Sequence, residues 1–380
     1  MSNDVHRIEL LLNEHREIVS NPRQQLEKYL AQGKKVIGCL PYFCPEELIY
    51  AAGMVPFGLW GAEMQTAEAK RYWPPFICSI LQTTLELGIK GHYDKLSAVM
   101  IPMLCDSLKG MDANWRYGVK TVPVIPVAHA QNRKIPAGVA FTASQYRKIK
   151  HRLEELAGRE ITNSDIAKAV QTTNRRRAVM RRFLAAAGSH PELLSPSARN
   201  AVFKSSYFLD ADQHSAKVAE LTELLEQSPQ TPWKGPKLVT SGIIADHSEL
   251  LKILDDCGVA IADDQVTHES LRFRTDIPET ADPIEGMAQQ IGEIEGCPVL
   301  FDPGKKRGKM LIDLVRQASA DGVLFVQTKF CDPEEYDYVP LKKMMDEAGI
   351  PSLLVEIDQQ TANYEQVRTK LETFCEMIRS

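Results

Sequence analysis

The chain has 380 residues, of which 44% are hydrophobic and 25% are charged, and it contains no long polar tract. This length suits two globular domains rather than one, each large enough to bury its own core. The formal net charge of −5 argues against a protein that coats nucleic acid or an anionic membrane. No apolar run approaches the roughly 18 residues that a membrane span needs. The polar amino terminus also lacks the apolar core of a signal peptide, so we expect a cytoplasmic protein.

The first part of the chain alternates short apolar runs with helical patterns. Its pattern predicts, in order, strand 34–40, helix 45–53, strand 54–60, helix 78–91 and strands 97–105 and 119–127. Pro45 suits the first turn of a helix, and Glu46 and Glu47 beside it favour a helix start over acid–base chemistry. Strands that alternate with helices predict a parallel sheet covered by helices on both faces.

The middle part of the chain is predicted to be helical throughout. One helix with a 3.6-residue period ends at Gly158, and either Thr162 or Asn163 can cap the next helix. Two arginine runs, at 175–177 and 181–182, are interpreted as a solvent-exposed helix face. Contact between these arginines and the phosphates of CoA is the less favoured alternative.

The third part returns to the alternation of strands and helices. Strands are predicted at 235–242, 259–264, 321–331 and 350–358, and helices at 247–258, 287–296, 310–320 and 333–349. A further short strand is expected at 298–302. Because this order repeats that of the first part, we expect two α/β domains in tandem with a helical segment between them. The domains are assigned to 1–141, which includes an amphipathic N-terminal helix, and 231–380, with the helical segment at 142–230.

Eight cysteines are scattered over the chain, and no pair has the Cys-x-x-Cys spacing of a local metal site. Cys105 and Cys331 each close a predicted strand at corresponding places in the two domains. The carboxyl ends of parallel strands are where such sheets bind ligands. Cys78 begins a helix, where backbone N–H groups favour a thiolate. Thiolates are the ligands of iron–sulfur clusters, so these three thiols are the candidate site.

The simpler alternative is that these thiols are ordinary buried side chains, since free cysteine usually behaves as a small hydrophobe. Cys39, Cys257, Cys297 and Cys375 are interpreted in this way, whereas Cys44 is left open because its loop also faces the crevice. The segment 262–272, which contains two aspartates, a histidine, a glutamate and an arginine, is either an active-site loop or an interdomain contact.

Several stretches together resemble the smaller, beta-type subunit of the (R)-2-hydroxyacyl-CoA dehydratases, a family within the wider benzoyl-CoA reductase group. They are GKKVIGCLPYFCPEELIYAAGMVPFGLWG, PFICSILQTTLELGIKG, VMIPMLCD, ADDQVTHESLRFRTDIP and KFCDPEEYDY. The resemblance covers essentially the whole chain. It implies two flavodoxin-like domains with a helical segment, and a [4Fe-4S] cluster held between them by Cys78, Cys105 and Cys331. The fourth iron ligand is left open between a non-protein group and Cys44.

The resemblance also implies a reaction and partners. Family members are cytoplasmic, anaerobic lyases of amino-acid fermentation that pair with a larger alpha-type subunit. An ATP-dependent iron–sulfur activator supplies one electron, which turns the acyl-CoA substrate into a ketyl radical and allows the 2-hydroxyl group to leave. The product is a trans-2-enoyl-CoA. Substrate is expected mainly on the larger subunit, so the catalytic residues of this chain stay unknown and its cluster is interpreted as an electron relay.

Three other interpretations stay open at this point. The chain could be part of a benzoyl-CoA-type reductase, which consumes electrons instead of recycling one. It could be a non-catalytic cluster carrier or assembly partner. It could also be a cluster-free flavodoxin-like binding protein, in which the thiols only fill space. The acyl group of the substrate cannot be read from this chain.

Overall fold

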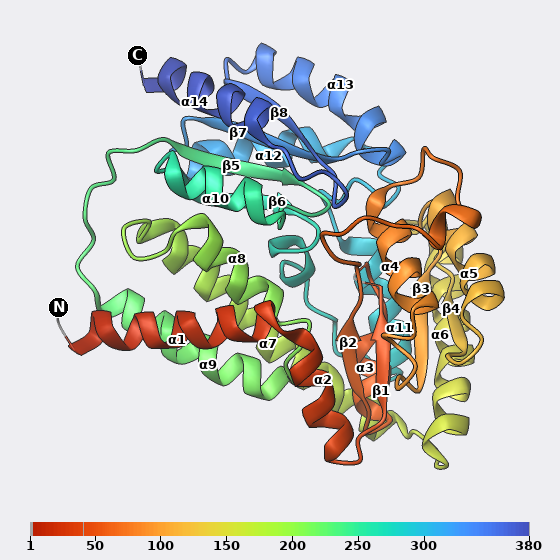
Figure 1. The fold of residues 1–380 in the computed structure, drawn as a ribbon. Coiled ribbons are helices and arrows are strands. Elements are labelled where there is room, and N and C mark those ends of the chain that lie inside the picture. Colours follow the sequence, from red (N-terminus) through yellow and green to blue (C-terminus); the bar gives the residue numbers. More distant parts are fainter. Residues whose placement is uncertain (1–2, 41, 380) are drawn as a thin grey trace.

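The computed structural model describes residues 3–40 and 42–379, which form two parallel four-stranded sheets with helices around them (Figure 1). The first sheet has the order β2-β1-β3-β4 and consists of β1 (Val36–Cys39), β2 (Val55–Gly58), β3 (Ala98–Pro102) and β4 (Val124–Val127). The second has the order β6-β5-β7-β8 and consists of β5 (Lys237–Gly242), β6 (Ala260–Val266), β7 (Gly322–Thr328) and β8 (Ser352–Ile357). Both sheets follow the flavodoxin-like order 2-1-3-4. The predicted tandem α/β architecture is confirmed.

Helices cover both faces of each sheet, as the strand-helix alternation predicts. The first sheet is flanked by α2 (Pro22–Ala31), α3 (Glu46–Ala51), α4 (Ser79–Ile89), α5 (Asp106–Gly118) and α6 (Pro136–Ala157), with a short turn η1 (Ala69–Arg71). The second is flanked by α10 (Ser248–Asp256), α12 (Lys306–Gln317), α13 (Asp332–Glu347) and α14 (Glu365–Arg379), and η2 (Ser270–Phe273) follows β6. Alternate strand residues enter opposite cores: Ile37 and Met100 pack on one face of the first sheet, and Val36 and Val99 on the other.

The helical layer consists of α7 (Asn163–Ser189), α8 (Pro196–Ser205) and α9 (Ala211–Gln227), joined by the N-terminal helix α1 (Asn3–Ser20) (Figure 1). The apolar face of α1 is buried there, against α7, α8 and α9. Gly158 ends α6 with a left-handed φ of 70°, and Thr162 caps α7 through a capping box with Asp165. The predicted helix stop is confirmed, and Thr162 is the cap of the two candidates. Residue 141, the predicted end of the first domain, lies within α6.

One segment of the third part of the chain packs in the first domain. Helix α11 (Pro283–Glu293) lies against α6 and shares the hydrophobic core of the first sheet, as Figure 1 also shows. The strand expected at 298–302 is absent from this described segment, where residues 298–300 form a turn. The segment is apolar for another reason: Leu300 is buried in the same hydrophobic core as α11. The prediction of a strand there was wrong because core packing, rather than strand pairing, buries the side chain.

None of the helices within residues 3–40 and 42–379 combines the length and the apolar character needed to span a bilayer.

Candidate functional site: three thiols at helix amino termini

Each of the three predicted site thiols occupies the N-cap position of a helix. Cys78 precedes α4, Cys105 precedes α5 and Cys331 precedes α13. The first turn of a helix has unpaired backbone N–H groups and the positive end of the helix dipole, which favour negative charge on a nearby sulfur atom. The backbone N–H of Leu108 already donates to Cys105 Sγ, with an N–S distance of 3.4 Å.

Cys105 and Cys331 are equivalent in topology as well as in sequence order. Strand β3 pairs with β1, the first strand of its sheet, and β7 pairs with β5, the first strand of the second sheet. Cys105 is the third residue after the last residue of β3, and Cys331 is the third after the last residue of β7. The predicted correspondence between these two thiols is therefore confirmed by the sheet order.

The three thiols share one environment although they come from two domains. All three are half-buried and pack against the same hydrophobic cluster, on the α4–α5 face of the first sheet. Burial raises the pKa of Cys78 to about 12, and the neighbouring Cys105 contributes to this rise. Burial also raises the pKa of Cys331, with further contributions from Glu334 and from Cys78. Without a metal the thiols are therefore protonated near neutral pH, and a metal centre must displace these protons.

Glu334 fixes the turn that presents Cys331. Its buried carboxylate accepts hydrogen bonds from the backbone N–H of Thr328, at 2.9 Å, and of Ile243, at 2.6 Å. These bonds join the end of β7 to the segment after β5. The residue before the thiol, Phe330, has a φ of 62°, a strained left-handed conformation for a side chain of its size. The acidic residues after Cys331 were interpreted as support for the thiol, and Glu334 has this role.

The donor set fits an iron–sulfur cluster better than a single ion. Among the residues that the structure describes, no group of three or more His, Cys, Asp or Glu side chains converges closely enough to hold one metal ion. A four-iron cluster is bound differently, because each thiolate coordinates its own iron atom and the sulfur atoms need not meet at one point. The hydroxyl of Tyr42, which packs in the same cluster as the thiols, is also buried without a hydrogen-bond partner among the described residues.

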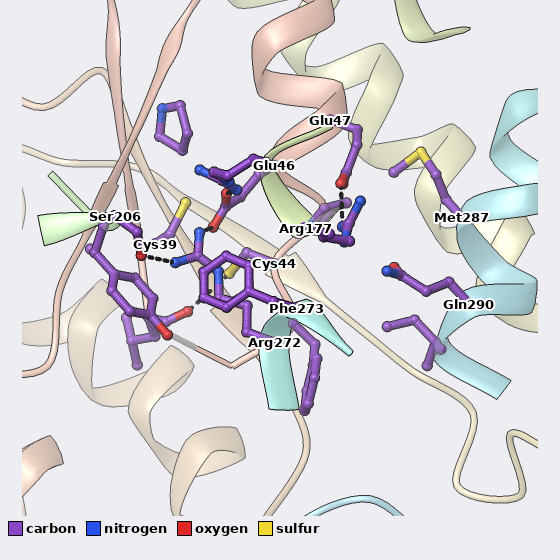
Figure 2. Close-up of a pocket in the computed structure, with 18 of the residues that line it drawn as sticks. Cys39, Cys44, Glu46, Glu47, Arg177, Ser206, Arg272, Phe273, Met287 and Gln290 are labelled. Carbon is purple, nitrogen blue, oxygen red and sulfur yellow. Dashed lines mark hydrogen bonds and ion pairs between the residues drawn. The ribbon is translucent and has the colours of Figure 1, made fainter. Parts of the chain in front are cut away.

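Cys44 does not join the three thiols. It packs against the hydrophobic cluster on the opposite face of the first sheet, and its Sγ lies 3.2 Å from the carbonyl oxygen of Leu40. Figure 2 shows it beside Cys39 and Glu46, in a cavity of about 60 Å³ between the first sheet, α7, η2 and α11. Burial raises the pKa of Cys44, with a further contribution from Cys39. The structure therefore gives no support to Cys44 as a ligand beside Cys78.

The same cavity contains the arginines that were interpreted as solvent-exposed. Arg176 and Arg177 are buried, and they pair with Glu46 and Glu47, with N–O distances of 2.7 Å in both pairs. Arg272 binds the other oxygen of Glu46. The prediction of a solvated face was wrong for these two arginines, because they point at carboxylates of α3. Of the other arginines in the runs, Arg175 and Arg182 are exposed, and Arg181 is half-buried.

Segment 262–272 forms contacts between parts of the chain. Arg272 joins the second domain to Glu46 of the first, and it also donates to Ser206 Oγ at 3.0 Å (Figure 2). Asp264 and Glu269 both bind Arg199 of the helical segment in a buried cluster. Of the two interpretations of this segment, these contacts favour the interdomain contact. Sequence reasoning missed the arginine partners because nothing in the local pattern indicates a contact with residues about 130 positions away.

Two flavodoxin-like sheets with thiols at their strand-to-helix turns define a two-domain α/β protein with an interdomain thiol site. The family described as "2-hydroxyglutaryl-CoA dehydratase, D-component" matches residues 41–378 of the chain. The chain therefore belongs to the 2-hydroxyacyl-CoA dehydratase family, in which it corresponds to the beta-type subunits of these lyases, and the resemblance found in its motifs is confirmed.

Individual relatives cover almost the whole chain. The (R)-phenyllactyl-CoA dehydratase beta subunit of Clostridium sporogenes is 44% identical over 367 residues, which cover 96% of this chain and 98% of that protein. The (R)-2-hydroxyglutaryl-CoA dehydratase beta subunit of Acidaminococcus fermentans is 40% identical, with 98% and 100% of the two chains covered. A benzoyl-CoA reductase subunit of Thauera aromatica is a more distant relative, 22% identical with 91% of each chain covered.

Proposed function

We propose that the chain is the iron–sulfur subunit of a heterodimeric (R)-2-hydroxyacyl-CoA dehydratase. The observation that carries this proposal is the set of three helix N-cap thiols from two domains, in a chain that aligns over nearly its full length with dehydratase beta subunits. The partner would be a larger alpha-type subunit, and an ATP-dependent iron–sulfur activator would supply the electron. The free state of all eight cysteines fits a reducing cytoplasm.

The side chains have distinct tasks in this proposal. Cys78, Cys105 and Cys331 hold the [4Fe-4S] cluster, and the helix N-termini behind them stabilise the negative charge of the thiolates. Glu334 keeps the turn before α13 in place, which fixes Cys331 relative to the first domain. When bound, the cluster supplies one-electron transfer. The half-buried position of the thiols limits access of water to this centre.

The reaction would take place mainly on the partner subunit. A 2-hydroxyacyl-CoA has an unactivated 3-proton and a poor leaving group at the 2-position, and one electron added to the thioester gives a ketyl radical that overcomes both barriers. Hydroxide leaves, the 3-proton is removed and the electron is returned as the trans-2-enoyl-CoA forms. The cavity beside Cys44, at about 60 Å³, is far smaller than the roughly 300–1,000 Å³ of typical small-molecule pockets. This argues against a substrate site in that particular cavity, and the relay role itself follows from the family resemblance.

Metal analysis of cysteine variants tests the proposal. The chain, purified anaerobically with its partner subunit, should be brown and should have about four irons per chain in this subunit, as a [4Fe-4S] cluster requires. Cys105→Ala should lose both colour and iron, because one of the three thiolate ligands is removed. Cys257→Ala is the matched control, since this half-buried thiol packs in the second domain away from the site. A wild-type chain that stays iron-free after anaerobic reconstitution would overturn the proposal.

The alternative with some support is a benzoyl-CoA-type reductase, because a subunit of such an enzyme is a distant relative. The two activities differ in electron balance. A dehydratase needs catalytic amounts of reductant, since the electron is recovered in every cycle, whereas a reductase consumes reductant in proportion to product. The much higher identity to dehydratase subunits favours the first. If the complex holds its cluster but never supports turnover of any acyl-CoA, the chain is a cluster carrier instead.

A further inference from the structure

Tyr42, in the turn between β1 and α3, has a side-chain hydroxyl without a hydrogen-bond partner among the described residues. Its side chain is buried, with 6% of the residue exposed, and its hydroxyl has no hydrogen-bond partner among the residues that the structure describes. Buried hydroxyl groups are nearly always paired, because an unpaired one loses its hydrogen bonds to water without replacement. Such a hydroxyl is available to a partner outside the protein chain, and its surroundings decide whether one is expected.

The surroundings of Tyr42 indicate which partner this is. The ring packs in the hydrophobic cluster that also contacts Cys78, Cys105 and Cys331. Burial raises the pKa of the phenol, and the next contributions come, in order, from Cys78, Cys331 and Glu334. Cys78 and Cys331 therefore lie close enough to this hydroxyl to influence it. A phenol O–H is a hydrogen-bond donor, and thiolate or sulfide sulfur is an acceptor.

We propose that the Tyr42 hydroxyl donates a hydrogen bond to sulfur at the three-thiol site and thereby raises the reduction potential of the cluster bound there. This inference rests on the proposed function, because it requires the cluster. Reduction adds negative charge to the cluster, and a hydrogen bond to sulfur stabilises that charge. Tyr42 is in this sense a positioning residue that acts through the cluster, and it takes no part in proton transfer to the substrate.

Tyr50 provides a matched control within the same part of the chain. Its hydroxyl is also buried without a partner among the described residues. After burial, however, the groups that shift the pKa of Tyr50 are charged side chains, and no thiol is among them: Arg176, Glu46, Asp210 and Arg272. Replacing either tyrosine with phenylalanine removes one unpaired hydroxyl and keeps the ring, so both variants should fold. Of these two variants, only Tyr42→Phe should affect a cluster at the thiol site.

The experiment is a redox titration followed by electron paramagnetic resonance on the anaerobic complex of this chain with its partner subunit. For Tyr42→Phe we expect unchanged iron content, a midpoint potential of this chain's cluster that shifts to more negative values, and altered g-values of the reduced cluster. Tyr50→Phe should match the wild type in all three. The assignment of the signal to this chain is checked by its loss in Cys105→Ala.

The outcomes separate the two proposals. An iron-loaded Tyr42→Phe variant with the midpoint potential and spectrum of the wild type would overturn this inference and leave the proposed function intact. Equal shifts in Tyr42→Phe and Tyr50→Phe would also overturn it, because the effect would not depend on contact with the thiol site. A wild-type chain without iron would overturn the proposed function and this inference together.

Discussion

At the scale of single residues, Glu46 shows how opposing effects combine. Burial alone would raise the pKa of its carboxyl group, but Arg272 and Arg176 outweigh burial and lower that pKa to about 2, from a usual value of 4.5. A carboxylate held between two guanidinium groups stays charged at every physiological pH. Glu46 is therefore a fixed ion that connects α3 to α7 and η2, and not a group that exchanges protons with a substrate.

Replacing Glu46 tests this assignment through the pH dependence of stability. Because the folded-state pKa lies below the unfolded value, ionised Glu46 stabilises the fold above pH of about 4.5, and this stabilisation is lost as the pH falls toward about 2. Glu46→Gln should lower the free energy of unfolding at pH 7 by about 3–5 kcal/mol, as loss of one partner of a buried ion pair does. Urea unfolding curves at several pH values between 7 and 3 measure it.

The difference between wild type and Glu46→Gln should shrink steadily in the acidic part of that series. A difference that stays constant with pH would show that shape, rather than charge, accounts for the loss. Glu27→Gln on α2 is the control, because its ion pair with Arg23 is exposed on both sides. Exposed pairs contribute only about 0.2–1 kcal/mol.

At the scale of elements, the start of α13 combines a thiol, a strained turn and an acidic side chain that has a structural role. Glu334 is the third residue after the N-cap Cys331, and its carboxylate binds backbone N–H groups of two other segments. The next residue, Glu335, is exposed although the sequence places the two acids side by side. Position on the helix, rather than residue type, therefore separates the structural acid from the solvated one.

Glu334→Gln should destabilise the protein by about 1–3 kcal/mol, because the amide group can accept only one of the two backbone hydrogen bonds and leaves the other N–H unpaired. It should also reduce iron retention at Cys331 during anaerobic gel filtration. Glu335→Gln should change the free energy of unfolding by no more than about 0.5 kcal/mol. It should leave the iron content unchanged. Urea unfolding and iron analysis of both variants provide the test, and equal behaviour of the two would contradict the assignment.

At the scale of the whole molecule, the two α/β domains are joined by more than their connecting helices. Helix α11 comes from the third part of the chain but packs in the core of the first domain. Arg133 holds it there, since its buried guanidinium donates to the carbonyl oxygens of Ile291, Gly292, Ile294 and Phe301. The first three are at or just after the carboxyl end of α11, where a cation is also favoured by the helix dipole, and Phe301 lies eight residues beyond it.

We therefore expect the wild-type chain to unfold in a single transition. Arg133→Met keeps much of the side-chain volume but leaves four carbonyl groups without their donor, so we expect a loss of about 3 kcal/mol or more and separate transitions for the two domains. Hydrogen exchange of residues 283–293 should become much faster than in the wild type, while the second sheet keeps its protection. Arg71→Met, on an exposed turn, is the control. Retained protection of α11 in Arg133→Met would contradict this role.

The sequence predicted the two sheets well because the signals of their strands and helices are local, whereas the three-thiol site stays a prediction. Strand–helix alternation indicated the two domains, and strand ends followed by Cys-Asp indicated Cys105 and Cys331 as equivalent residues. The buried arginines were mistaken for a solvent-exposed face, because a run of charged residues has the same sequence pattern whether it contacts water or carboxylates far along the chain. The short apolar run at 298–302 was mistaken for a strand for a similar reason. Leu300 is buried in the same core as α11, and burial by such a distant contact leaves no periodic pattern in the sequence. The role proposed for Tyr42 depends on neighbours from both domains, and no single segment of the sequence indicates it.

The division of the three thiols between domains has a consequence for the biogenesis of the protein. Cys78 and Cys105 belong to the first domain, whereas Cys331 belongs to the second and is synthesised 226 residues after Cys105. The proposed cluster, which needs all three thiols, therefore cannot be completed until much of the second domain has been made. By linkage, a group that binds only the assembled pair of domains also stabilises their arrangement. Exposure to oxygen would then damage more than electron transfer, because loss of the cluster would also remove a link between the two halves of the molecule.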